Sequence, residues 1–414
     1  MKNQKKMWLS ALVAAAMCVC FASCKDDDEV PVVVIPDVDV TGEYGIASDS
    51  EAGTAPVVTV NNVEIPNISA PYIEEGTNGA VGNISFTGIK GMDGNFLSLY
   101  GTGNDSQNIW MTIDGKAKAL TIVNAEDVTK AAAKKGKADI VFLVDNSGSM
   151  SEEANALAAQ VLAWSKTISE VVDCQFGCVG YGDNDYGVDG GMDLADITVL
   201  DAFLNDRGKY GTGRTYGFYG DNAEKLENLA LSSSNGYYNS YYNECGALAL
   251  HFADEQFTWR SGANRIYINF TDEPNQPATY KQWSVETLNT ESELYNWNAS
   301  KGTVHSVYSG TDAARYEEGG SYYNYNISNP YGWYEKPWAM SEYTGGITLQ
   351  TDPYFTEFKL DDIEVTGAIT GSYVLRFNVT KDLLTGTHTI VITIKDKNTG
   401  SEATKTFTDI SFAN

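Results

Sequence analysis

The alternation of apolar and polar residues divides the chain into three zones with different expected secondary structure. From residue 40 to 130 short alternating runs are broken by Gly, Asn and Asp, a pattern typical of strands and turns. The β signal returns over 363–414, where residues 397–400 have the composition of a hairpin turn. The runs that we expect to be strands are 57–60, 96–100, 109–113, 119–123, 373–379 and 388–394.

The middle zone, 138–361, alternates between strand and helix patterns. Residues 139–144 form a largely continuous apolar run, as expected of a strand buried on both faces, and 152–172 follow with helical spacing. Further strands are expected over 174–181, 197–203 (at the sheet edge), 265–270, 303–308 and 347–350, and helices over 222–231, 244–257 and 337–343. Such alternation predicts an α/β fold, with a mostly parallel sheet covered by helices on both faces. The two β-rich flanks can pair into one β-sandwich from which this domain projects.

The first residues have the features of an export signal rather than of a folded domain. Lys2, Lys5 and Lys6 precede an apolar segment over 8–21, which is too short for a confident membrane span. The segment ends in Phe21-Ala22-Ser23-Cys24, which resembles a bacterial lipobox. That resemblance implies that 1–23 is a signal peptide and that Cys24 is acylated, which would anchor the chain stably to a membrane.

Residues 24–39 are expected to form an acidic tether. Their Lys25-Asp26-Asp27-Asp28-Glu29 sequence looks like the export signal of Bacteroidetes-type lipoproteins, which are sent to the outer face of the outer membrane. A solvated acidic linker is the alternative interpretation. We expect a lipid-anchored protein that is exposed on the cell surface and contacts the membrane only through its anchor.

Composition narrows the classes of function. The formal charge of -27 disfavours nucleic acid as a partner, although solubility alone can explain it. Only 3 His accompany 25 Tyr, and none of the His lies in a motif that would orient a catalytic base, so we expect no enzyme. Beyond the lipobox the cysteines are Cys174, Cys178 and Cys245, and we expect buried free thiols.

Two short motifs place oxygen ligands where strands are expected to end. Asp145, Ser147 and Ser149 follow the first strand of the middle zone, and Asp272 follows a later one. The carboxyl edge of a parallel sheet is where ligands bind. Carboxylates and hydroxyls are hard ligands, suited to Mg²⁺, Ca²⁺ or Mn²⁺ rather than to zinc.

Asp-x-Ser-x-Ser with a later Thr-Asp resembles the metal-ion-dependent adhesion site of the von Willebrand factor type A (vWA) family. The resemblance covers residues 138–361, about half of the chain. It implies a Rossmann-like fold in which Asp145, both serines and Asp272 hold a divalent metal. It also implies a further ligand from a middle loop, and an open coordination position that accepts an acidic group from a partner.

The middle ligand departs from the family pattern. Residues 235–244 offer no Thr or Asp where the family usually has one. Glu244, Ser240 or Asn243 could substitute, and Glu244 is the only charged candidate. The alternative is that the site is looser or empty.

Loops expected at the same rim are rich in Tyr, Asn, Ser and Gly, a mixture that antibody loops also use for recognition. The expected binding residues are Tyr237, Tyr238, Tyr241, Tyr242, Tyr323, Tyr325 and Trp333. Packing of the long loops is the alternative role. We therefore expect metal-dependent adhesion, or recognition of a protein or glycan that offers a carboxylate. The alternative is a structural subunit of a surface fibre or outer-membrane complex with a degenerate metal site.

Overall fold

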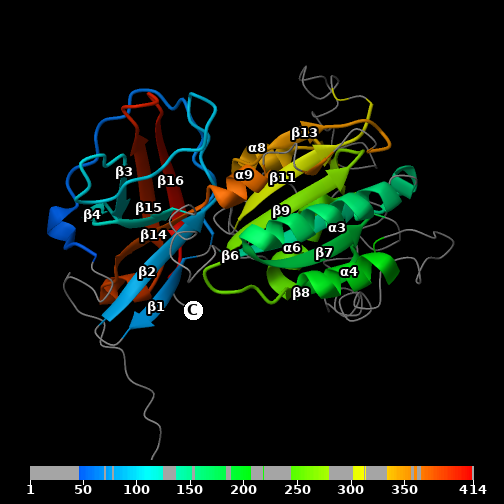
Figure 1. Cartoon of the computed structure of the whole chain (residues 1–414), viewed down its shortest axis with the longest axis horizontal. Helices are drawn as coiled ribbons and strands as arrows, with labels where there is room; N and C mark the ends of the chain where they lie inside the picture. Colours follow the sequence, from blue (N-terminus) through cyan, green and yellow to red (C-terminus); the bar gives the residue numbers. More distant parts are fainter. Residues whose placement is uncertain are drawn as a thin grey trace, which may run out of the picture.

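The computed structural model describes residues 46–69, 71–76, 79–124, 137–151, 154–182, 188–206, 218, 244–278, 302–311, 313, 333–355, 359–360 and 365–412. These residues form an α/β body and a β body that lie side by side (Figure 1). The expected signal peptide, Cys24, the acidic tether and the expected helix over 222–231 lie outside the described residues. None of the helices that the structure describes is long and apolar enough to cross a bilayer.

The α/β body is built on a sheet of six described strands. They are, in sheet order, β13 (Thr348–Gln350), β11 (Thr303–Tyr308), β9 (Asn264–Thr271), β6 (Lys137–Asp145), β7 (Asp173–Tyr181) and β8 (Val188–Ala195). All neighbours are parallel except β7 and β8, which are antiparallel. Every residue of β6 after its first is buried, as the continuous apolar run predicted. The prediction of a mixed α/β chain with a parallel sheet is confirmed.

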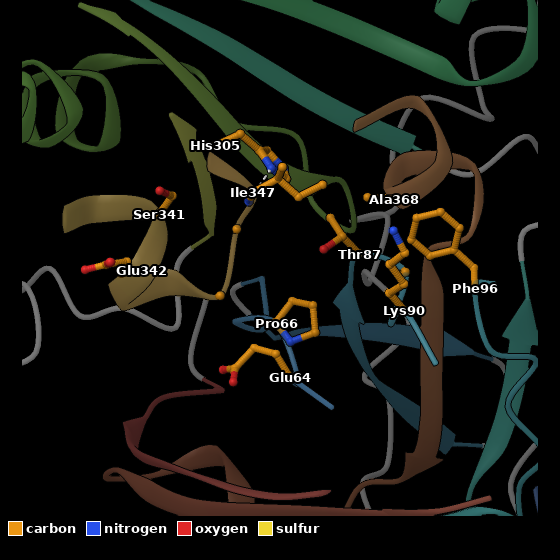
Figure 2. A pocket seen from close by; sticks show the side chains of 13 residues that line it. Glu64, Pro66, Thr87, Lys90, Phe96, His305, Ser341, Glu342, Ile347 and Ala368 are labelled. Carbon is orange, nitrogen blue, oxygen red and sulfur yellow. Dashed lines mark hydrogen bonds between the residues drawn. The ribbon is translucent and has the colours of Figure 1, made fainter. Parts of the chain in front are cut away.

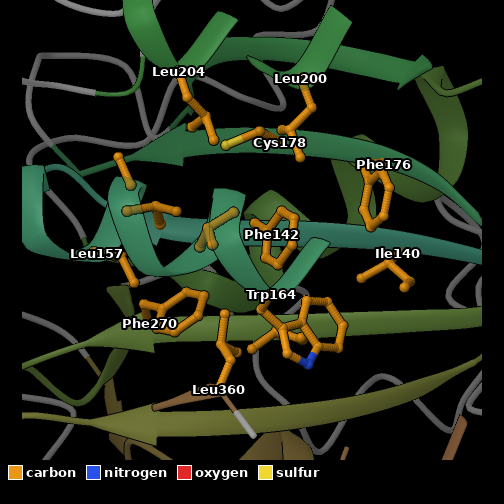
Figure 3. Packing of buried hydrophobic residues seen from close by; sticks show 14 of the residues in the cluster. Ile140, Phe142, Leu157, Trp164, Phe176, Cys178, Leu200, Leu204, Phe270 and Leu360 are labelled. Atoms are coloured by element: carbon orange, nitrogen blue, oxygen red, sulfur yellow. The ribbon is translucent and has the colours of Figure 1, made fainter. Parts of the chain in front are cut away.

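Side chains of alternate residues of β6 pack into two hydrophobic cores, one on each face of the sheet. Phe142 packs with α3 (Ala154–Val171) and α4 (Ile197–Asp206), and its ring lies 6.2 Å from that of Trp164, centroid to centroid (Figure 3). Leu143 belongs to the opposite core, with α6 (Gly246–Gln256) and Met340 of α8 (Ala339–Thr344). Helices therefore cover both faces of the sheet.

The expectation of an edge strand over 197–203 is wrong, because these residues form helix α4. The Asp196 carboxylate accepts hydrogen bonds from the backbone N–H groups of Thr198 and Val199, at 2.8 and 3.1 Å, and so caps the helix. The edge strand is β8, which the hydrophobic pattern does not predict because glycines interrupt it. A Cβ on Gly191 would lie 2.1 Å from the Cys178 carbonyl oxygen, so this close strand pairing requires glycine.

The β body contains two sheets of four described strands, each built from both ends of the chain. One sheet has the order β1 (Tyr72–Gly76), β2 (Gly79–Phe86), β14 (Tyr373–Asn378), β5 (Thr121–Asn124). The other has the order β16 (Glu402–Ile410), β15 (His388–Lys395), β3 (Ile109–Ile113), β4 (Lys116–Lys118). Leu375 of the first sheet and Met111 and Ile392 of the second lie in one hydrophobic core.

Two expected strands of this body are not strands. Residues 57–60 belong to no strand, and Val57 is 79% and Val60 58% exposed. Phe96 forms only an isolated bridge with Lys90. The remaining described elements are the short helices η1 (Asp49–Glu51), η2 (Gly148–Ser151), α9 (Val365–Thr370) and η7 (Lys381–Leu384), and the strands β10 (Asn275–Ala278) and β12 (Trp333–Glu335).

The two bodies meet at the amino-terminal edge of the parallel sheet. The Asn67 N–H donates to the Thr344 carbonyl at 3.2 Å, and the Arg265 N–H, at the start of β9, donates to Ser69 Oγ at 3.0 Å. The Trp164 indole N–H donates to Thr366 Oγ1 at 2.9 Å. The carboxyl edge, where the oxygen ligands were predicted, therefore lies at the far end of the sheet from the β body.

Candidate metal site

Asp145 is the last residue of β6, and its carboxylate is held from two sides. Its side chain is buried, and Oδ1 accepts the Ser147 backbone N–H at 2.8 Å. Oδ2 accepts the Thr271 hydroxyl at 2.8 Å, because β9 is the parallel neighbour of β6 and ends at the same edge. The strand order thus brings together motifs that are 126 residues apart.

The remaining oxygen ligands form a chain across this edge. Ser147 Oγ lies 3.0 Å from Ser149 Oγ, and the Ser149 hydroxyl donates to Asp272 Oδ1 at 3.1 Å. Ser149 is exposed, Asp272 is half-buried and Ser147 is buried. The structure therefore places Asp145, Ser147, Ser149 and Asp272 in one hydrogen-bonded cluster that opens to solvent at Ser149.

Glu244 lies beside this cluster, just before α6. Its carboxylate accepts the Gln276 side-chain amide at 2.8 Å, and its carbonyl accepts the Gln276 N–H at 3.0 Å. Gly182, with φ +88°, makes room for it. A Cβ there would lie 3.0 Å from Glu244 Cγ and 3.4 Å from Asp145 Oδ1. Sequence reasoning missed Gly182 and Gln276, although a glycine directly after a buried strand was a usable signal.

The acids of this cluster are electrostatically crowded. Burial, together with repulsion from Asp272, raises the pKa of Asp145 to about 7. Burial, together with repulsion from Asp145, raises the pKa of Glu244 to about 9. A cation bound among these carboxylates would relieve the repulsion.

The donor set fits a hard divalent cation, because it combines carboxylate and hydroxyl oxygens and contains neither sulfur nor imidazole. Within the described residues, no group of three or more His, Cys, Asp and Glu side chains is placed to hold a metal by itself. Any site here therefore depends on the hydroxyls of Ser147 and Ser149 as well as on the acids.

Most of the residues expected at the binding rim belong to parts of the chain that the structure does not describe. Ser240, Asn243, Tyr237, Tyr238, Tyr241, Tyr242, Tyr323 and Tyr325 lie outside the described residues. The backbone of Trp333 begins β12, which pairs with β10, and β10 starts three residues after Asp272. Asn275 fixes this region, since its Oδ1 accepts the Ala247 N–H and its amide donates to Glu335 Oε2.

The three cysteines that the structure describes are free thiols, and Cys178 and Cys245 are buried. Burial raises the pKa of Cys245 to about 12, so this thiol stays protonated. The expectation of free thiols is confirmed, but the expectation that all three are buried is wrong for Cys174, which is only half-buried.

Comparison with known proteins yields only distant structural likeness. No family profile and no curated protein sequence matches the chain. The pilus adhesin SpaC from Lactobacillus rhamnosus GG is 12% identical with a TM-score of 0.29, over 79% of this chain and 36% of that chain.

The ArnB paralog VWA2 from Sulfolobus acidocaldarius is 11% identical with a TM-score of 0.26, over 80% of this chain and 75% of that one. The minor pilin PilB from Streptococcus sanguinis is 11% identical with a TM-score of 0.28, over 76% and 80%. Thus adhesins, a pilin and a vWA protein are among the similar structures, but likeness this weak carries no conclusion about function.

Proposed function

We propose that the protein is a surface-exposed lipoprotein whose α/β body is a vWA-type domain that binds a divalent cation and, through it, a protein or glycan partner. The two-sheet β body would act as the stalk between this domain and the lipid anchor. Because the bodies meet at the opposite edge of the parallel sheet, the candidate metal site faces away from the β body, as a binding tip should.

The observation that carries the proposal is the convergence of Asp145, Ser147, Ser149 and Asp272 from two separate turns. The hydrogen-bond chain from Ser147 through Ser149 to Asp272 leaves neighbouring oxygens 3.0 and 3.1 Å apart. These four side chains would hold the cation, and Glu244 is the candidate for the middle-loop ligand. A bound cation would supply a Lewis-acidic position for a partner carboxylate, at the end of the cluster where Ser149 is exposed.

Titration calorimetry of the chain without residues 1–24 tests the metal claim. Mg²⁺, Ca²⁺ and Mn²⁺ should each be titrated into the wild type, Asp145→Ala, and Asp105→Asn as a control on an exposed acid of the β body. We expect at least one cation to bind the wild type and the control, but not Asp145→Ala. Equal heats from all three proteins would refute a metal site at the sheet edge.

The anchor is tested separately. We expect Cys24 to incorporate radiolabelled palmitate in a Bacteroidetes host, and we expect protease added to intact cells to degrade the protein. Cys24→Ala should lose the label and should no longer be recovered with the outer membrane. Full protection from external protease would contradict surface exposure.

A structural role in a surface assembly is the second candidate. It is favoured by the middle loop, because residues 235–244 contain no Thr or Asp where the vWA pattern has a metal ligand. Under this alternative, neighbouring surface proteins would co-purify equally with and without chelator, whereas adhesion through the cation predicts that chelator releases the partner.

A further inference from the structure

The first segment that the structure describes, residues 46–52, contains η1 and is held firmly on the β body. Ile46 is fully buried and Ala52 is 2% exposed. Both pack in a small apolar cluster with Val81 of β2 and with Ala119. Figure 1 shows η1 beside β4, on the side of the β body away from the α/β body. We call residues 46–52 the latch.

Polar contacts fasten the latch to β4 and β14. Asp49 forms an ion pair with Lys118 of β4, and the two side chains are only 16% and 6% exposed. The other Asp49 oxygen accepts the Ala119 backbone N–H at 2.9 Å. The Asn378 side-chain amide, at the end of β14, donates to the Ala47 carbonyl at 2.9 Å. The latch is therefore held by ionic and hydrogen-bonded contacts as well as by apolar packing.

These attachment points lie at the far ends of the two strands that connect the bodies. β5 begins at Thr121, two residues after Ala119, and its last residue, Asn124, precedes the link to β6. β14 ends at Asn378, and its first residue, Tyr373, follows α9. Tyr373 and Asn124 are direct partners in the antiparallel pairing of β14 and β5. The two covalent connections to the α/β body thus leave the β body side by side, and the latch holds the opposite ends of the same strands.

Helix α9 fixes β14 to the α/β body. Ile369 lies in the hydrophobic core that α3 shares with the parallel sheet. On the side of the β body, the Gly88 N–H donates to the Ala368 carbonyl at 2.7 Å. A Cβ on Gly367 would lie 2.4 Å from Phe96 Cε2, and Figure 2 shows the Phe96 ring beside Ala368. A pull on the α/β body would therefore reach β14 through a helix that both bodies hold.

We propose that the latch transmits tension between the lipid anchor and the α/β body along β5 and β14. The inference rests on the anchor at Cys24 and the distal binding site proposed above, because a tethered protein that grips a partner is pulled from both ends. Tension from Cys24 would enter at residue 46 and pass to Lys118 and Asn378. β14 pairs with β2 over six residues and with β5 over four, so a pull along β14 loads many ladder hydrogen bonds together rather than one after another.

Without the latch, tension would take a longer route. Residues 53–60 follow the latch, and Val57 and Val60 are among their exposed side chains. Among the described residues, the next backbone–backbone hydrogen bond along the chain joins the Asn62 N–H to the Glu402 carbonyl of β16, at 2.9 Å. β16 lies in the other sheet of the β body, not in the sheet of β5 and β14. Release of residues 47–61 would add up to about 50 Å of chain, at about 3.4 Å a residue.

Single-molecule force spectroscopy on the chain from Cys24 onward tests the proposal. One handle is attached to the Cys24 thiol. The other is attached to Ala159→Cys, an exposed position on α3. Every protein also carries Cys174→Ser, because Cys174 is only half-buried and could compete for the handle.

The latch variant, Asp49→Ala/Lys118→Met, removes both charges of the buried pair. The matched control, Asp382→Ala/Lys116→Met, removes an exposed ion pair that also involves β4. We expect the latch variant to lengthen by up to about 50 Å in an early step, at less than half the force that unfolds either body. The wild type and the control should show no such step.

A second pulling point separates the role in tension from a general loss of folding. With Cys24→Ser and the handle moved to Val57→Cys, beyond the latch, the wild type and the latch variant should give the same traces. Three outcomes overturn the proposal: an early step in the wild type pulled from Cys24, identical traces of wild type and latch variant from that point, or an equally large difference between them from Val57. Lipid, cation and partner are all absent, so these outcomes are independent of the tests of the anchor and of the cation site.

Discussion

The Ser149 hydroxyl donates a 3.1 Å hydrogen bond to the Asp272 carboxylate, and so connects turns that are 123 residues apart. Ser149 follows β6 and Asp272 follows β9, which are parallel neighbours in the sheet. This contact closes the cluster of oxygen ligands around Asp145.

Asp272→Asn should weaken cation binding without disturbing the fold. The amide keeps the size of the side chain and can still accept from Ser149, but it removes one of the charges that attract a cation. At a cation concentration of 100 times the Kd, the wild type should gain about 2.7 kcal/mol of stability, whereas a hundredfold weaker variant gains about 0.4 kcal/mol. Chemical denaturation with and without cation measures this difference. Equal gains in both proteins would exclude Asp272 as a ligand.

Glu244 should behave as a metal ligand rather than as a structural acid. We expect Glu244→Ala to weaken cation binding, and Glu244→Thr to restore part of it, because a hydroxyl at this position is the ligand that the vWA resemblance implies. Titration calorimetry of the two variants beside Glu255→Gln, an exposed acid near the end of α6, the helix that follows Glu244, provides the comparison. Unchanged affinity in Glu244→Ala would mean that the site lacks a middle-loop ligand from this residue.

Substitution of Arg260 should lower the free energy of unfolding more than most substitutions in the α/β body. Its Nε donates to the fully buried Asp139 at 2.7 Å, and its Nη1 donates to Asp173 at 2.8 Å. Arg260→Ala would leave the Asp139 charge buried without its partner, which typically costs about 3–5 kcal/mol. The free energy of unfolding in urea measures the loss.

The exposed pair between Lys166 and Asp201 is the matched control for that experiment. Lys166→Ala should change the free energy of unfolding by about 1 kcal/mol or less, because solvent screens such pairs. Similar losses in the two variants would show that burial does not set the strength of the Arg260 contacts.

His305 should make the folded state sensitive to mild acid. Burial lowers its pKa to about 4, whereas in the unfolded chain the imidazole takes up a proton near pH 6.5. Between these values only the unfolded state is protonated at this residue, so stability falls as the pH falls from 6.5 to 4, by roughly 3 kcal/mol in total.

His305 Nδ1 accepts the Ile347 backbone N–H at 3.0 Å. The variant His305→Asn keeps an acceptor for this N–H but has no titratable ring. The stability difference between wild type and variant should therefore change by about 2 kcal/mol between pH 7 and pH 5. Urea unfolding at the two pH values, with cation absent, measures it. Parallel pH profiles for the two proteins would show that the ring is not held neutral by burial.

Local patterns in the sequence were sufficient for much of the α/β body. The apolar run over 139–144 predicted β6 because a central strand of a parallel sheet is buried on both faces, so nearly every residue must be apolar. The motif around Asp145 could be located for a related reason: a polar turn directly after such a strand must lie at the sheet edge. What these patterns predict depends only on the chemistry of neighbouring residues.

The tertiary structure decided what depends on distant partners. Strand β8 could not be predicted because its glycines do not give a hydrophobic strand pattern. Gly191 is needed for its close approach to Cys178, and this contact exists only when β7 and β8 are paired. Strands of the β body come from both ends of the chain, and no local pattern records which strand pairs with which. The same is true of Glu244 beside Asp145, and of His305, whose Nδ1 accepts the Ile347 N–H only because β11 and β13 are neighbours in the sheet. Sequence determined which residues can be buried or can bind a cation, and packing between remote segments determined which of them lie together.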